Sequence, residues 1–154
     1  MSLQLTYDLV GTGWCRCEIR LGTSEAVVTG SYLSDCLRGL ARATLDMAGG
    51  SPLSRCSFDE EPGEFRWLLR RDANELQLRI LEFDELWGEQ PDSEGTEIIN
   101  LSCPVASFVI AVRDALRSVR SKYGLAGYLE KWVEHDFPQD ELDQLELVAP
   151  RLGA

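Results

Sequence analysis

The chain has 154 residues, of which 44% are hydrophobic, and its 26 acidic and 15 basic side chains give a net charge of −11 at pH 7. This length and composition predict a single folded domain over residues 1–154 and argue against a disordered chain. The excess of acid disfavours binding to nucleic acid or to an anionic membrane, and it favours a basic protein as partner.

Three further features of the sequence predict the cellular compartment of the protein. No apolar run approaches the ~20 residues that span a bilayer. Residues 1–10 alternate in polarity, whereas the core of a signal peptide is continuously apolar. The five cysteines are an odd number without framework spacing, which indicates reduced thiols. We therefore expect a soluble, cytoplasmic protein.

The first third of the chain predicts three strands and one helix. Residues 3–9 and 15–21 alternate between apolar and polar side chains, which is the period of a half-buried strand. A third, shorter strand is expected at 25–29. Ser34 is the expected N-cap of the helix that follows, in which Leu37, Leu40, Ala41 and Thr44 recur at helical spacing. Gly49 and Gly50 are expected to end it.

The middle of the chain predicts a meander of strands, separated by turns that contain Pro, Gly or Asn. The expected strands are residues 55–59, 65–70, 76–83 and 97–103.

Helices are predicted in the last third. Residues 105–123 carry one apolar stripe, which includes Phe108, and Gly124 is expected to close this helix. Two short helices are expected at about 128–134 and 138–147. Tyr128 and Trp132 are spaced to pack the first of these onto the sheet.

These elements predict an α+β fold: a twisted antiparallel sheet of about six or seven strands, with one long and two or three shorter helices packed on one face. The alternation predicts that the odd-numbered residues of 3–9, 15–21 and 65–69 face the core and that these strands share one sheet. An arginine-rich opposite face would then be formed by Arg16, Arg20, Arg66, Arg70 and Arg79. A solvated face with cross-strand ion pairs is favoured over a functional one.

Three segments, residues 59–64, 82–97 and 136–146, hold 16 of the 26 acids. Trp87 lies in the second segment and has two interpretations: an exposed anchor for a partner, or a lid folded back onto the core. The residues predicted to bind a basic partner are Glu85, Trp87, Glu89, Asp92, Asp140, Glu141 and Asp143.

No catalytic, cofactor-binding or metal-binding residue is assigned. Cys15 and Cys17 fall on the core face of a strand and lack further zinc ligands, so core packing is favoured. Cys36, in the first turn of a helix, is the only cysteine for which a lowered pKa and reactivity are considered. His135, the only histidine, is expected to cap a helix end or to be exposed rather than to act as a base. Phosphate-binding loops and a nucleophile elbow are absent from the sequence.

In size, acidity and fold class the chain is similar to bacterial toxin-neutralising immunity proteins and to type III secretion chaperones, a similarity that identifies no residue. The leading hypothesis is a non-enzymatic protein-binding module that engages a basic partner. The alternative is an enzyme or small-ligand-binding protein with a pocket between sheet and helices. A homodimer that pairs through an edge strand is compatible with either.

Overall fold

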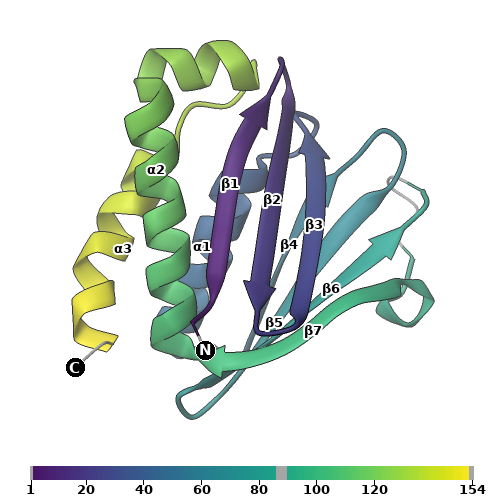
Figure 1. The fold of residues 1–154 in the computed structure, drawn as a ribbon, viewed down its shortest axis with the longest axis vertical. Coiled ribbons are helices and arrows are strands. Elements are labelled where there is room, and N and C mark those ends of the chain that lie inside the picture. Colours follow the sequence, from purple (N-terminus) through teal and green to yellow (C-terminus); the bar gives the residue numbers. More distant parts are fainter. Residues whose placement is uncertain (1, 86–89, 153–154) are drawn as a thin grey trace.

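The computed structural model describes residues 2–85 and 90–152, which form an α+β fold of antiparallel strands and helices (Figure 1). The strands are β1 (Gln4–Val10), β2 (Trp14–Leu21), β3 (Ser24–Ser31), β4 (Leu53–Asp59), β5 (Glu64–Asp72), β6 (Glu75–Phe83) and β7 (Thr96–Pro104). The helices are α1 (Cys36–Ala48), α2 (Val105–Trp132) and α3 (Gln139–Leu152), and Asp92–Glu94 forms a short 3-10 turn, η1.

The strands form two sheets, so the expectation of one continuous sheet is wrong. The first sheet has the order β1-β2-β3 and the second the order β4-β5-β6-β7. The physical reason is that β3 crosses the second sheet instead of pairing with its edge. The Thr29 hydroxyl of β3 is hydrogen-bonded to Glu60 beyond β4, while Glu25 at the other end of β3 shares a hollow with Asn100 of β7.

The predicted burial of odd-numbered residues is confirmed for most of them in β1, β2 and β5. In β1 and β2 the odd-numbered side chains are buried except Leu21, which is half-buried, and Cys17 and Ile19 are at most 1% exposed. In β5 the buried residues include Trp67 and Leu69. Side chains of both sheets and of all three helices belong to one hydrophobic cluster, and the ring of Tyr7 from the first sheet meets that of Phe58 from the second edge-on.

The second sheet also buries side chains on its outer face, which the alternation does not predict. Leu81 and Phe83 point to the same side as Arg66, because β5 and β6 pair Arg66 with Leu81 and Glu64 with Phe83. Gly95 lies directly over them: an ideal Cβ built on Gly95 would be 2.7 Å from Phe83 Cζ. The chain at Gly95 therefore covers this end of the second sheet.

The helices gather along one side of the sheets (Figure 1). Helix α2 contacts β1 through its predicted apolar stripe, and Phe108 is fully buried. At Gly124 the backbone adopts φ 68° and ψ 178°, which is not helical, so the long helical stretch ends there as predicted and a second stretch runs from beyond Gly124 to Trp132. Tyr128 and Trp132 are fully buried beyond this turn. Helix α3 packs on α1 and α2.

Helix α1 begins one residue later than the Ser34 N-cap predicts. Its N-cap is Asp35, whose side chain makes no capping hydrogen bond. The Ser34 hydroxyl instead accepts a hydrogen bond from the backbone N–H of Asp59, at 3.0 Å. Ser34 thus joins the start of α1 to the end of β4.

Candidate functional site

Two acidic segments that are separate in the sequence meet at one end of the second sheet. The antiparallel register pairs Glu64 with Phe83, so the β4–β5 turn lies beside the end of β6. An ideal Cβ on Gly63 would be 2.7 Å from the carbonyl oxygen of Phe83, which shows how closely the two backbones approach. We call this region the acidic end; its residues are Asp59, Glu60, Glu61, Glu64, Glu82, Asp84, Glu85, Asp92 and Glu94.

Five carboxylates of the acidic end are exposed and make no ion pair with any described residue: Glu61, Glu82, Asp84, Glu85 and Glu94. Three of the others are engaged within the chain, and Glu60 among them is hydrogen-bonded to Thr29. Glu64 and Asp92 both pair with Arg66, at 3.0 and 2.8 Å. Unpaired carboxylates that share one end of a sheet produce a negative potential that attracts cations.

The electrostatics of Asp59 reflect this environment. Burial raises the pKa of its carboxyl group above the ordinary value, and the neighbouring carboxylate of Glu64 raises it further. Both influences disfavour the charged form. A cationic side chain placed beside Asp59 would relieve this effect.

Arg66 holds the acidic segment onto the sheet. One guanidinium nitrogen donates to the carboxylate of Asp92 and to the carbonyl oxygen of Gln90, each at 2.8 Å. The guanidinium also lies 4.1 Å from the centre of the Phe83 ring. The expectation that Arg66 belongs to a solvated face is therefore wrong: the residue is 9% exposed, because the segment around Asp92 covers it.

The residues predicted to bind a partner are not brought together as one site. Glu85 is exposed at the acidic end, and Asp92 is there but paired with Arg55 and Arg66. Trp87 and Glu89 lie outside the described residues, so the two interpretations of Trp87 stay open. The other three predicted residues belong to α3, which lies on the helical side of the molecule (Figure 1).

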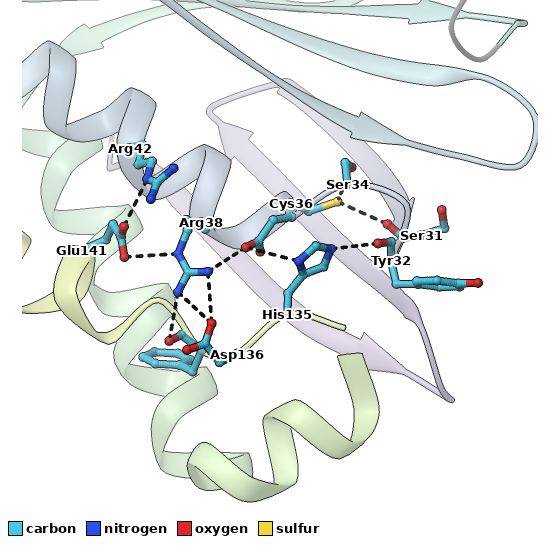
Figure 2. A network of polar contacts seen from close by, with 11 residues as sticks. Ser31, Tyr32, Ser34, Cys36, Arg38, Arg42, His135, Asp136 and Glu141 are labelled. Carbon is cyan, nitrogen blue, oxygen red and sulfur yellow. Dashed lines mark hydrogen bonds and ion pairs between the residues drawn. The ribbon is translucent and has the colours of Figure 1, made fainter. Parts of the chain in front are cut away.

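Within α3, Asp140 and Asp143 are exposed, whereas Glu141 is buried. The carboxylate of Glu141 accepts hydrogen bonds from Arg38 at 3.4 Å and from Arg42 at 3.1 Å, both on α1 (Figure 2). Glu141 therefore joins two helices of the same chain and is not part of the exposed acidic surface.

Arg38 is the centre of this network, shown in Figure 2. Besides Glu141, it donates to Asp35 at 2.9 Å and to Asp136 at 3.2 Å. Burial raises the pKa of Asp35, an effect that the charges of Arg38 and His135 oppose. The carboxylates of Asp35, Asp136 and Glu141 thus surround the guanidinium of Arg38. These contacts connect residues 135–137 and α3 to α1.

His135 belongs to the same network and does not cap a helix. Its Nε2 atom lies 3.0 Å from the carbonyl oxygen of Tyr32, to which it donates, and its Nδ1 atom lies 3.7 Å from the Asp35 carboxylate. A hydrolase would need a Ser or Cys nucleophile beside this histidine. Among the described residues of the network, the thiol of Cys36 is fully buried and does not provide one. The contacts of His135 are those of a positioning residue within the fold.

The five cysteines are free thiols, and four of them are buried. Burial raises the pKa of Cys36 well above its ordinary value, which is opposite to the lowered pKa considered for this thiol at the start of α1. The helix N-terminus favours a thiolate only where the sulfur remains solvated, and Cys36 is 0% exposed.

Over residues 2–85 and 90–152, no group of three or more His, Cys, Asp or Glu side chains is arranged to hold a metal ion. None of the described helices has the length and apolar character needed to cross a membrane. Comparison with protein-family models, with curated proteins and with solved structures finds no match to this chain.

Proposed function

We propose that the chain is a non-enzymatic protein-binding module, of the kind represented by immunity proteins and secretion chaperones, and that it engages a basic partner through the acidic end. The observation that supports this is the meeting of residues 59–64 and 82–85, which places several exposed, unpaired carboxylates side by side. Such a surface speeds the approach of a basic protein and orients it.

The exposed acids of α3 are a second acidic surface on another part of the molecule. We assign the primary contact to the acidic end because more carboxylates lie together there. In α3, by contrast, Glu141 and Glu146 are paired with arginines of α1 and α2.

The experiment is affinity capture from native cytosol with matched charge reversals. The test variant is Glu82→Lys with Glu85→Lys, at the acidic end. The control is Asp72→Lys with Glu75→Lys, which reverses the same number of exposed charges at the opposite end of β5 and β6. We expect basic proteins to be retained by the wild type and by the control, and to be lost with the test variant.

Binding should also weaken as salt rises, because exposed charges are screened beyond about 8 Å at physiological ionic strength. If the test variant and the control retain the same proteins, the acidic end is not the contact surface. If the retained proteins are acidic, the proposed charge complementarity is wrong.

A further inference from the structure

A groove on the outer face of the second sheet is lined by three arginines. It has a volume of about 510 Å³ and crosses β4, β5 and β6. We call it the arginine groove; its lining includes Leu53, Arg55, Leu68, Arg70, Gln77, Arg79 and the carboxylate-bearing residue Asp92. The chain has a net charge of −11, yet three arginines gather in this groove, and two of them are already paired with acids of the same chain.

The strand register interleaves these arginines with leucines. Arg70 is paired with Leu53 on β4 and with Gln77 on β6. Leu68, two residues earlier on the same strand, lies between Arg55 and Arg79 in the same way. Neighbouring strands are about 5 Å apart, so each guanidinium has an apolar side chain beside it. Leu53 is 67% exposed, which is unusual for a large apolar side chain on a sheet face.

The chain already shows what these arginines bind. The Asp92 carboxylate is 2.7 Å from the guanidinium of Arg55, and Glu97 pairs with Arg79. Both acids belong to the acidic segment 82–97: Asp92 lies in η1 and Glu97 in β7. Arg70, the next arginine on this face, is exposed and forms no ion pair with a described residue.

We propose that this groove binds a second acidic segment, carried by a partner protein, in which a carboxylate lies next to a large apolar side chain. The carboxylate pairs with Arg70, whose planar guanidinium suits bidentate contact. The apolar side chain covers Leu53 and Leu68. The bound segment would continue along the face of the sheet where Asp92 already contacts Arg55. This segment is acidic, whereas the partner proposed for the acidic end is basic.

The experiment is an NMR titration of the isotopically labelled full chain with two blocked hexapeptides. One peptide alternates leucine with glutamate, and the control alternates leucine with lysine. We expect only the glutamate peptide to cause saturable shifts, and we expect them at the backbone amides of residues 53–55, 68–70 and 77–79.

Two variants test the two halves of the recognition. Arg70→Glu should weaken binding about tenfold or more, the scale of a lost charge-assisted hydrogen bond. Leu53→Ser should also weaken it, through the apolar contact. Arg20→Glu is the control, since Arg20 lies on the outer face of the first sheet, where it contacts Gln4; it should leave binding unchanged. Spectra without peptide show whether each variant is folded.

The proposal is overturned if the glutamate peptide gives no saturable shifts, if the lysine peptide shifts the same amides equally, or if Arg70→Glu retains full affinity. Shifts at these amides that depend on protein concentration alone would show that a second copy of the chain occupies the groove. None of these outcomes depends on the acidic end, so the two proposals are tested separately.

Discussion

Arg66 and Asp92 form an ion pair at 2.8 Å across 26 positions of the chain, and the same guanidinium nitrogen donates to the carbonyl oxygen of Gln90. The Arg66 side chain is only 11% exposed. This contact fixes the chain at Asp92 to β5. At Gly95 the chain then passes over Phe83 and enters β7. The acidic end and the arginine groove are therefore neighbours that share Asp92.

The first prediction concerns Asp92. Burial acts to raise the pKa of its carboxyl group, but the hydrogen bond from Arg66 and the charge of Arg55 outweigh it and lower the pKa below the ordinary 3.8. A carboxyl group with a lower pKa in the folded state stabilises the protein above its unfolded pKa, and that contribution is lost as the pH falls.

Asp92→Asn should therefore lower the free energy of unfolding at pH 7, by less than about 1 kcal/mol because ion pairs with exposed partners are screened. The difference from the wild type should shrink as the pH falls below 3.8. Urea denaturation, followed by tryptophan fluorescence at several pH values, measures the difference in free energy of unfolding and its dependence on pH. Glu94→Gln is the control at an exposed carboxylate. A difference that is independent of pH would contradict the ionic origin of the effect.

The second prediction concerns Glu141, whose side chain is 9% exposed between Arg38 and Arg42. Glu141→Gln removes the charge that both guanidiniums face and should lower the free energy of unfolding by about 1–3 kcal/mol. Asp143→Asn, an exposed change two residues further along α3, should stay within about 0.5 kcal/mol of the wild type. Equal stabilities of the two variants would show that the network does not hold α3 in place.

The third prediction compares two glycines. An ideal Cβ on Gly30 would be 2.6 Å from Cys36 Sγ and 3.2 Å from Phe58 Cβ, so Gly30→Ala overpacks the core and should cost about 1–3 kcal/mol. Gly39 lies inside α1, where an added Cβ meets only Cys56 Cβ at 3.6 Å, an ordinary contact. Gly39→Ala should raise the free energy of unfolding by about 0.5–1 kcal/mol. Thermal unfolding followed by circular dichroism compares them; a more stable Gly30→Ala protein would contradict this packing.

The fourth prediction concerns the thiols. Burial raises the pKa of Cys36 and of Cys17, and it raises the pKa of Cys103 to about 11. Because the thiolate is the reactive form, a chromogenic disulfide reagent at pH 8 should react slowly with the native protein and should count five groups in urea. The native rate should rise as the pH approaches 11. Rapid reaction of one thiol at pH 8 would identify a solvated cysteine.

Much of the fold could be predicted from local patterns. Alternation in residues 3–9 and 15–21 predicts which side chains of the first hairpin are buried, because a strand places successive residues on opposite faces. The stripe that contains Phe108 likewise predicts the buried side of α2. Both depend only on the spacing of apolar residues within one element.

The number of sheets could not be predicted in this way. Whether β3 pairs beside β4 or crosses it depends on contacts such as Thr29 with Glu60, which are far apart in the sequence. The end of the long helical stretch at Gly124, by contrast, could be predicted. A glycine with positive φ ends many helices, and the non-helical backbone of Gly124 separates the stretch before it from the one that runs to Trp132.

For the candidate site, composition revealed the acidic segments but not which of them meet. That depends on the register that pairs Glu64 with Phe83. The acidity of this part of the sequence also groups Glu141 with Asp140 and Asp143, although Glu141 is buried and its two neighbours are exposed. One signal was available: a helix that faces α1 must turn one of its acids toward Arg38, and an acid among apolar residues at helical spacing is the natural choice.

The contact of Arg38 with Glu141 also implies an order in which the helices can pack during synthesis. The two residues are 103 positions apart, and synthesis proceeds at about 5–20 residues per second. Arg38 and the start of α1 therefore emerge from the ribosome several seconds before the carboxylates of Asp136 and Glu141 exist. During that interval the arginine has only Asp35 as a partner among the three acids of the network. Docking of α3 is thus a late step, and a nascent chain halted before residue 136 should expose the surface of α1 that α3 later covers.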